Sequence, residues 1–196
     1  MTSGSSDQVT LVDRSGTVIG AMDKFEAHRG EGSLHLACSV FLFRRDPHTQ
    51  AVQLLIQQRS PLKIVGQWQW GNTICGNVRP NETLEACAQR RLGEELTIAP
   101  AVLEEVTTFY YQTPCNEEYS EHELDHIFAG WSMIDVITPN PQEVILTEWI
   151  DWPRENELES ARQQEQFLAM RDFAPWFRLF IHSDTVRKAL YEFLRK

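Results

Sequence analysis

The stretch that decides the fold is Gly76-Asn-Val-Arg-Pro-Asn-Glu82-Thr-Leu-Glu-Ala-Cys-Ala-Gln-Arg90-Arg91-Leu-Gly-Glu94-Glu95-Leu-Thr-Ile98. From about Glu82 to Leu96 its apolar residues recur with the helical period, which predicts a loop followed by an α-helix. The polar Asn81, directly after Pro80, is the expected helix cap. The residues expected on one face of this helix are Leu84, Ala88, Arg91 and Glu95.

The segments outside this helix are mostly typical of β-strands. The predicted strands are Val9–Val12, Thr17–Ala21, Leu34–Phe43, Val52–Gln57, Thr107–Gln112, His122–Met133 and Trp149–Trp152. Two further helical segments are expected, Glu155–Arg171 and Pro175–Arg195, the second with a break near Ser183. Strands mixed with few helices predict an α/β fold in which a mixed β-sheet is sandwiched between α-helices. A single domain is expected over residues 9–196, after a flexible N-terminus of residues 1–8.

Composition restricts the partners and the compartment. The chain has 196 residues and a net charge of −10, whereas nucleic-acid-binding proteins carry a basic face, so no nucleic-acid partner is expected. A phosphorylated ligand would need a divalent cation to neutralise it. No window approaches the ~20 apolar residues of a membrane helix, and the N-terminus lacks the pattern of a secretory signal. We therefore expect a soluble, cytoplasmic protein with no membrane partner and four free thiols; the oligomeric state does not follow from these features.

Residues 76–98 resemble the Nudix box: a glycine, five residues, a glutamate, seven residues, then Arg-Glu-apolar-x-Glu-Glu-x-Gly-apolar. The residues that match in register are Gly76, Glu82, Arg90, Glu94 and Glu95. The resemblance implies a Nudix fold and a helix whose acidic residues hold Mg²⁺ against a diphosphate. Two positions depart from it, because Arg91 stands where hydrolases usually have a metal-binding glutamate and Thr97 replaces the closing glycine. A lost carboxylate and an added cation equip the chain poorly for the usual hydrolysis.

The same Arg-Arg departure is found in type 1 isopentenyl-diphosphate isomerases. Other motifs that resemble this family follow in one order between about Val9 and Ser183. They are Met22-Asp-Lys24-Phe-Glu-Ala-His28, Leu34-His35-Leu-Ala, Leu54-Leu-Ile-Gln-Gln-Arg59-Ser, Trp70-Gly-Asn72-Thr-Ile-Cys75-Gly, Glu121-His-Glu123-Leu-Asp and Phe173-Ala-Pro-Trp176-Phe. Several separate motifs in one order are a specific signal, and the chain is identified as a Nudix protein that resembles these isomerases.

The resemblance implies an isomerase of isoprenoid biosynthesis that interconverts isopentenyl and dimethylallyl diphosphate by a 1,3-proton shift. Cys75 and Glu123 would be the two acid/base groups, on opposite faces of the substrate. Chemistry agrees with such a pair, because protonating an alkene needs a positioned acid and removing a proton from the far face needs a second group. Trp176 would stabilise the tertiary carbocation through its π face, and Tyr111 would hydrogen-bond the carboxyl of Glu123.

The same resemblance implies how the partner, a small prenyl diphosphate, is held. Its diphosphate would be bound by Lys24, Arg59 and Lys63. A guanidinium such as that of Arg59 binds phosphate through two parallel hydrogen bonds. Mg²⁺, held through Glu95, would accompany the substrate.

A further divalent metal, Zn²⁺ or Mn²⁺, is implied by the family's cage of three histidines and two strand glutamates. His28, His35, Glu121 and Glu123 match four of these ligands, and the two glutamates share one face of a predicted strand. The fifth ligand, normally a histidine two residues beyond the cysteine, is Asn77 here. An amide oxygen is a weaker ligand than imidazole for a transition metal.

Asn77 leaves three interpretations open. The protein is a working isomerase with a weakened metal site, or an isomerase-like enzyme acting on another prenyl or allylic diphosphate. Alternatively, it is a Nudix protein that hydrolyses a diphosphate or binds a prenyl diphosphate without catalysis. A hydrolase needs neither a cysteine before the box glycine nor an aromatic side chain that stabilises a cation, so Cys75, Glu123, Tyr111 and Trp176 favour the first two.

Overall fold

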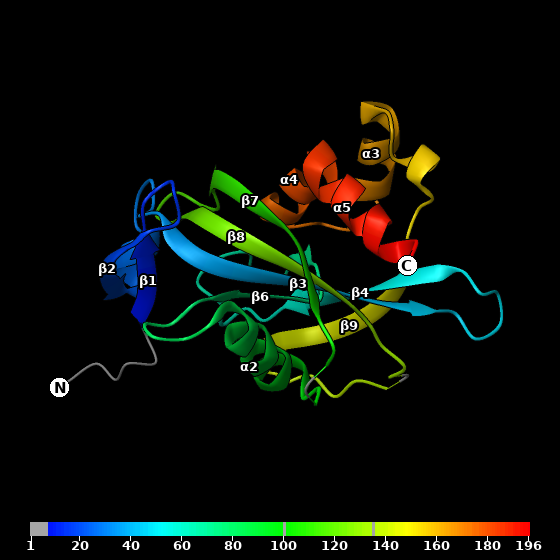
Figure 1. The fold of residues 1–196 in the computed structure, drawn as a ribbon, viewed down its shortest axis with the longest axis horizontal. Coiled ribbons are helices and arrows are strands. Elements are labelled where there is room, and N and C mark those ends of the chain that lie inside the picture. Colours follow the sequence, from blue (N-terminus) through cyan, green and yellow to red (C-terminus); the bar gives the residue numbers. More distant parts are fainter. Residues whose placement is uncertain (1–7, 100, 135) are drawn as a thin grey trace.

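A computed structural model describes residues 8–99, 101–134 and 136–196 and shows a mixed β-sheet with helices on both sides (Figure 1). The strands are β1 (Gln8–Val12), β2 (Val18–Asp23), β3 (His35–Arg45), β4 (Val52–Arg59), β5 (Trp70–Gly71), β6 (Ile74–Asn77), β7 (Glu104–Pro114), β8 (Ser120–Trp131) and β9 (Val144–Asp151). The helices are α1 (Lys24–His28), α2 (Leu84–Leu96), the short 3₁₀-helix η2 (Glu155–Glu157), α3 (Ala161–Leu168), α4 (Pro175–His182) and α5 (Asp184–Leu194). This arrangement confirms the predicted α/β sandwich.

Strand β3 organises the sheet. It pairs in parallel with β8, from His35 opposite Glu123 to Phe43 opposite Trp131, and antiparallel with β6, β4 and β1. Strand β7 extends the sheet beyond β8, and β9 extends it beyond β4. Because β6 and β8 both pair with β3, Cys75 of β6 and Glu123 of β8 lie on the same face of the sheet although they are far apart in the sequence.

The apolar run of β3 packs on both faces of the sheet, as expected for a buried strand. Phe41 contacts α4 and Phe43 contacts α5, whereas Val40 and Leu42 belong to a second core that includes Leu92 of α2. Each fully buried side chain of this size stabilises the fold by roughly 1.5–3 kcal/mol. The two cores fix α2 on one side of the sheet and the C-terminal helices on the other.

Helix α2 begins later than predicted. The expected cap, Asn81, is wrong: it has a positive φ of 64° and lies in the preceding turn. The cap is Thr83, whose hydroxyl accepts a hydrogen bond from the Ala86 N–H at 3.1 Å. The Gly76 that opens the box is required for packing, because a Cβ there would collide with the side chain of Arg91.

The C-terminal region was predicted in part. The break near Ser183 is confirmed, since α4 ends at His182 and α5 begins at Asp184. The single helix expected over Glu155–Arg171 is wrong, because η2 ends at Glu157 and Ser160 caps a new helix, α3. The short elements α1, β5 and β6 were not predicted, and β9 is longer than the expected Trp149–Trp152.

The expected flexible N-terminus, residues 1–8, overlaps the first strand by one residue. Residues 1–7 of the expected flexible N-terminus lie outside the described residues, and Gln8 is the first residue of β1. Among the helices that the structure describes, none is long and apolar enough to cross a membrane.

Candidate active site

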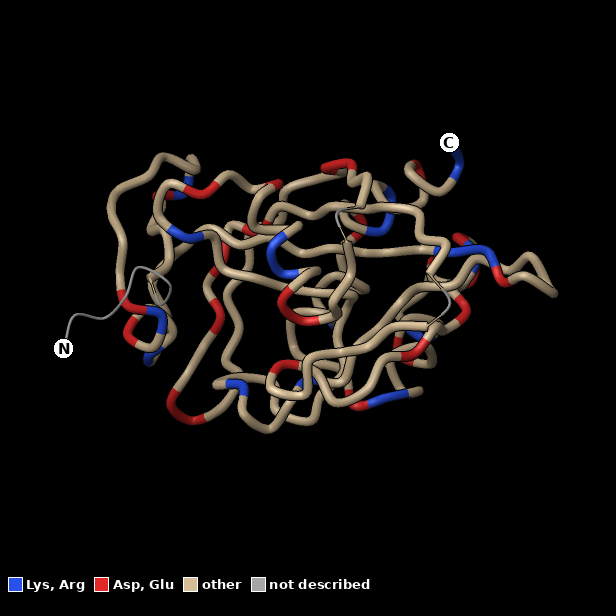
Figure 2. Tube along the Cα trace, turned by 90° about the horizontal axis from the view of Figure 1, so that it is seen from below, with Lys and Arg blue, Asp and Glu red and all other residues tan. Residues whose placement is uncertain are grey.

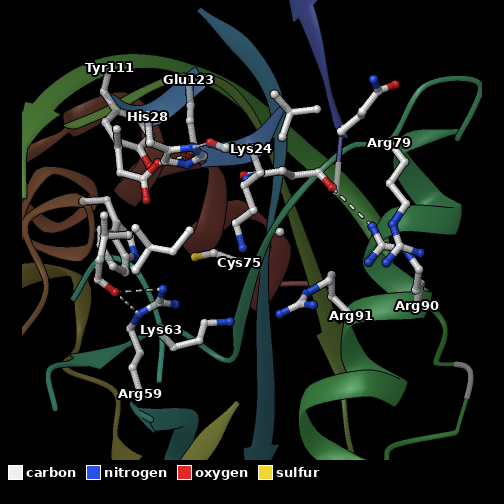
Figure 3. Close-up of a pocket in the computed structure, with 18 residues that line it drawn as sticks. Lys24, His28, Arg59, Lys63, Cys75, Arg79, Arg90, Arg91, Tyr111 and Glu123 are labelled. Atoms are coloured by element: carbon white, nitrogen blue, oxygen red, sulfur yellow. Dashed lines mark hydrogen bonds and ion pairs between the residues drawn. The ribbon is translucent and has the colours of Figure 1, made fainter. Parts of the chain in front are cut away.

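A cavity between the sheet, α1, α2 and α4 gathers the predicted site residues (Figure 3). Ten of the twelve predicted residues line it: Lys24, His28, Arg59, Lys63, Cys75, Asn77, Tyr111, Glu121, Glu123 and Trp176. The other two, His35 and Glu95, are fully buried and contact lining residues. Figure 3 shows Cys75 between a group formed by Tyr111, His28 and Glu123 and a group formed by Arg59, Lys63 and Arg91.

The Cys75 thiol is held by neighbouring acceptors. Its Sγ lies 3.1 Å from Asn72 Oδ1. The Asn72 amide cannot be reversed without losing two hydrogen bonds, because its Nδ2 donates to the carbonyls of Val40 and Ile74. The oxygen of Asn72 is therefore fixed as the acceptor that faces the thiol.

A second contact reaches Cys75 from β3, where Ser39 is its register partner. Ser39 Oγ lies 3.3 Å from the sulfur and donates to Asp125 Oδ2 at 2.7 Å. Burial, followed by the nearby charge of Asp125, raises the pKa of the Cys75 thiol well above its usual range. The thiol is therefore the dominant form, which suits a group that gives a proton to an alkene.

Glu123 and Tyr111 are register partners on β8 and β7. The expected contact is present, since the Tyr111 hydroxyl donates to Glu123 Oε2. Burial, followed by the adjacent charge of Glu121, raises the pKa of Glu123. The raised pKa makes the Glu123 carboxylate a stronger base, which suits a group that removes a proton from the substrate.

Four buried residues form a group that could hold a metal ion. The ligand atoms of His28, His35, Glu121 and Glu123 all lie within 4.8 Å of one another. The Nδ1 atoms of His28 and His35 lie 2.7 Å and 2.8 Å from the carbonyl oxygens of Lys24 and Ser33. These carbonyls can only accept, so both Nδ1 atoms carry the proton and both Nε2 atoms are directed into the group.

This group fits a metal ion on its own geometry. His28 Nε2 lies 3.0 Å from Glu121 Oε2, and His35 Nε2 lies 3.5 Å from Glu123 Oε1. His35 Nε2 and Glu121 Oε2 are buried and make no hydrogen bond to any described residue. Imidazole and carboxylate lone pairs that face one another in a buried site need a cation or a proton between them.

The pairing of β6 with β3 fixes the position of Asn77. It is the register partner of Ala37, two residues along β3 from His35, so its side chain lies on the face of the sheet that also carries Cys75. It lines the same cavity. The strand geometry therefore brings position 77 to the side of the sheet that carries the metal ligands.

The other end of the cavity is cationic. Along the chain as a whole, Lys and Arg positions are interspersed with Asp and Glu positions (Figure 2), but here Lys24, Arg59, Lys63 and Arg91 converge. Burial, followed by the charges of Lys63, Arg91 and Arg59, lowers the pKa of Lys24 to about 8. Such repulsion between neighbouring cationic side chains is characteristic of a site that binds an anion.

Among the residues that the structure describes, hydrogen bonds hold Arg59 on one edge of its guanidinium. Its Nε and Nη2 both donate to the carbonyl oxygen of Val65 at 3.1 Å, and its guanidinium lies 4.8 Å from the centre of the Trp176 ring. Gly66, with φ +62°, permits this packing, because a Cβ there would lie 2.6 Å from the Trp176 ring. The Nη1 group remains available for a phosphate oxygen.

Two carboxylates balance part of this positive charge. Glu95 is fully buried, accepts from Gln57 Nε2 at 2.6 Å and forms ion pairs with Lys63 and Arg91. Burial alone would raise the pKa of Glu95, but Arg91 and Lys63 lower it to about 2. The second carboxylate, Glu143, forms ion pairs with the same two cations.

The remaining box residues build the scaffold. Arg90 Nε and Nη2 donate to the two oxygens of Glu82 at 2.6 Å and 2.9 Å, and Arg90 Nη1 donates to Glu94 at 3.0 Å. These bonds tie the loop before α2 to the helix. They explain the spacing of Glu82 and Arg90 without a direct contact with a ligand.

Several residues of the site were not assigned from the sequence. Arg91 was noted only as a departure from the box, and Asp125 only as the last residue of the motif Glu121-His-Glu123-Leu-Asp. Period-2 alternation was a signal for Asp125, because it places this residue on the strand face of Glu121 and Glu123. For Ser39 and Glu143 there was none, because their contacts depend on strand register and on a turn between distant segments, whereas Asn72 lies within the quoted motif that ends at Cys75 and Gly76.

Comparison with known proteins identifies the family of the chain. Residues 33–177 match the NUDIX domain family. The isopentenyl-diphosphate Delta-isomerase of Photobacterium profundum is 38% identical over 165 residues, which are 83% of this chain and 89% of that protein. The isopentenyl-diphosphate Delta-isomerase of Streptomyces coelicolor is 35% identical over 183 residues, 93% of this chain and 84% of that protein.

Solved structures confirm the fold. A crystal structure of a Deinococcus radiodurans protein superposes with a TM-score of 0.65 at 20% identity, covering 89% of this chain and 97% of that one. The NUDIX domain of Shewanella oneidensis NrtR, solved with ADP ribose, gives a TM-score of 0.55 at 18% identity, covering 79% of this chain and 87% of that one.

Proposed function

The chain belongs to the NUDIX domain family and, within it, to the isopentenyl-diphosphate Delta-isomerases, and we propose that it interconverts isopentenyl and dimethylallyl diphosphate through Cys75 and Glu123. The observation that carries the proposal is the cavity itself, in which a protonated thiol and a carboxyl of raised pKa lie beside a cationic end. A 1,3-proton shift needs two such groups, one that gives a proton and one that removes a proton elsewhere on the same substrate.

The proton movements are assigned to two atoms. The Cys75 thiol gives its proton to one carbon of the double bond, and the Glu123 carboxylate takes a proton from the carbon on the other side, so that the double bond moves by one carbon and each group ends in the protonation state opposite to the one in which it began. Asn72 and Ser39 hold the thiol, and Tyr111 holds the carboxyl through its hydroxyl. A positioned acid/base pair of this kind contributes rate because neither group has to find its geometry during the reaction.

The positive charge that develops on the substrate carbon is assigned to Trp176. Its side chain is buried at the cavity wall, where its ring also lies against the Arg59 guanidinium. The face of an indole ring attracts a cation. Burial of this wall excludes water, which would trap a carbocation as an alcohol.

The diphosphate is assigned to the cationic end. Lys24, Arg59, Lys63 and Arg91 supply positive charge there. The carboxylates of Glu95 and Glu143 converge on Lys63 and Arg91 and provide the hard oxygen ligands that suit Mg²⁺, which would enter with the substrate through Glu95. Bound Mg²⁺ supplies neutralisation of phosphate charge.

The four-residue group at the other end is assigned to Zn²⁺ or Mn²⁺. His28, His35, Glu121 and Glu123 supply nitrogen and oxygen ligands, with Asn77 as a weaker fifth. A metal bound there would hold Glu123 in a fixed orientation. The histidines keep their Nε2 atoms directed inward through the backbone contacts of their Nδ1 atoms.

Incubation with isopentenyl diphosphate and Mg²⁺ tests the proposal. We expect dimethylallyl diphosphate to accumulate while no phosphate is released. Phosphate release without isomerisation would instead identify a Nudix hydrolase, and binding without turnover would identify a prenyl-diphosphate binder. Activity confined to another allylic diphosphate would retain the isomerase chemistry with a different substrate.

A further inference from the structure

Glu143 lies between Lys63 and Arg91 at the cationic end of the cavity. Its carboxylate forms ion pairs with Lys63 and with Arg91 Nη2, the latter at 3.0 Å. Glu95 forms ion pairs with the same two residues. Lys63 and Arg91 are therefore neutralised by two carboxylates that come from different elements.

The backbone holds Glu143 at this place. Its carbonyl oxygen accepts from the Ser60 N–H at 3.0 Å, next to the loop that carries Lys63. Asn140, at the start of the same turn, donates its N–H and its Nδ2 to the carbonyls of Glu95 and Glu94 at the end of α2. The turn is thus tied to both segments whose cations Glu143 contacts.

The cationic end of the cavity carries more positive than negative charge. Lys24, Arg59, Lys63 and Arg91 supply four positive charges, and Glu95 and Glu143 supply two negative charges. A free diphosphate that takes Lys63 and Arg91 leaves both carboxylates beside its own negative charge. A divalent cation that arrives with the diphosphate gives those carboxylates a new partner.

We propose that Glu143 makes the site select the diphosphate as its complex with a divalent cation and disfavour the free diphosphate. This inference rests on the proposed function, because it takes the cationic end as the diphosphate site. On binding, Lys63 and Arg91 exchange carboxylate oxygens for phosphate oxygens, and the carboxylates exchange ammonium and guanidinium groups for the divalent ion. Without that ion the exchange leaves like charges in contact, which opposes binding.

The Glu143 side chain is more exposed than the Glu95 side chain. The Glu95 carboxylate is fully buried and bonded to Gln57, whereas the Glu143 side chain is 27% exposed. Neutralising Glu143 therefore removes one charge and leaves Glu95 in place. The amide of Glu143→Gln can still accept a hydrogen bond from Lys63 or Arg91, so the two cations keep a polar neighbour.

Calorimetric titration with inorganic diphosphate, in chelator-treated buffer and in the same buffer with Mg²⁺, tests the inference. For the wild-type protein we expect binding to be tighter with Mg²⁺ by a factor on the order of 100. In Glu143→Gln the metal-free affinity should rise at least about fivefold, and the Mg²⁺ enhancement should fall by a similar factor. Glu143→Asp keeps the charge and should retain the wild-type enhancement, which also guards against misfolding of the amide variant.

The matched control is Glu85→Gln, which removes one exposed carboxylate in the first turn of α2. An unchanged Mg²⁺ enhancement in Glu143→Gln would overturn the inference, as would an equal loss in Glu85→Gln, because the effect would then reflect net charge. The titration does not depend on turnover. If the wild-type protein does not isomerise the substrate but the Glu143→Gln variant loses the Mg²⁺ enhancement of diphosphate binding, the proposed reaction is refuted and this inference is supported.

Discussion

Replacement of Arg59 by lysine tests whether the cationic end of the cavity binds the diphosphate through the Arg59 guanidinium. Arg59→Lys keeps the charge but replaces a planar fork by a single ammonium group. In the structure Nε and Nη2 of Arg59 donate to Val65, and the Nη1 edge is left for the ligand. One ammonium cannot reproduce both contacts from one position.

The expected loss follows from this geometry. A hydrogen bond to a charged group contributes about 1.5–3 kcal/mol, which corresponds to roughly 10- to 150-fold in affinity. We expect KM for isopentenyl diphosphate to rise by that factor in Arg59→Lys, with kcat changed less than about threefold, because Arg59 is assigned to the diphosphate and not to proton transfer.

Steady-state kinetics at saturating Mg²⁺ measure both constants. The matched control is Arg171→Lys, since Arg171 also lies over an indole ring, 5.7 Å from the centre of Trp70, and pairs with Glu148 outside the cavity. Its KM should not change. A KM within twofold of wild type for Arg59→Lys would refute the assignment and make Arg59 a structural contact of Val65 and Trp176.

Three further predictions concern charge and metal. Because the pKa of Lys24 is lowered to about 8, its cation is present below that pH and lost above it; kcat/KM should fall as pH rises through about 8, and Lys24→Arg should remove this limb of the pH profile. The pKa of Glu95 is lowered to about 2, so it contributes about 3 kcal/mol of stability above its unfolded pKa that is lost as pH falls toward 2; urea unfolding should show the deficit of Glu95→Gln shrinking below about pH 4.5, and a constant deficit would contradict this. Asn77→His should tighten Zn²⁺ or Mn²⁺ binding about tenfold or more in a chelator competition assay, whereas an absence of bound metal in both proteins would show that the cage interpretation is wrong.

The sequence predicted the elements whose signals are local. The continuous apolar run of β3 and the helical period of α2 were sufficient because each pattern is contained in one segment. Strand β6, with four residues, is too short to show alternation, and the cap of α2 was misplaced because Asn81 and Thr83 are both good capping residues.

The candidate site was predicted as far as its motifs lie in contiguous stretches. Cys75, Glu123 and the ligands of the metal group each belong to such a stretch. Glu143 does not: it is an ordinary acidic residue of a turn, and it reaches Lys63 and Arg91 because β9 pairs with β4 and Asn140 bonds the turn to the end of α2. Its contacts are a property of the sheet order, which local periodicity does not encode.

The most direct test of the assignment of Cys75 and Glu123 is proton exchange followed by ¹H NMR in D₂O. Purified, metal-replete protein is incubated with isopentenyl diphosphate and Mg²⁺. We expect dimethylallyl diphosphate to form with deuterium in the new methyl group, and we expect Cys75→Ala and Glu123→Gln each to abolish that signal while inorganic diphosphate still binds. Full exchange in Cys75→Ala, or no exchange in the wild-type protein, would contradict the account.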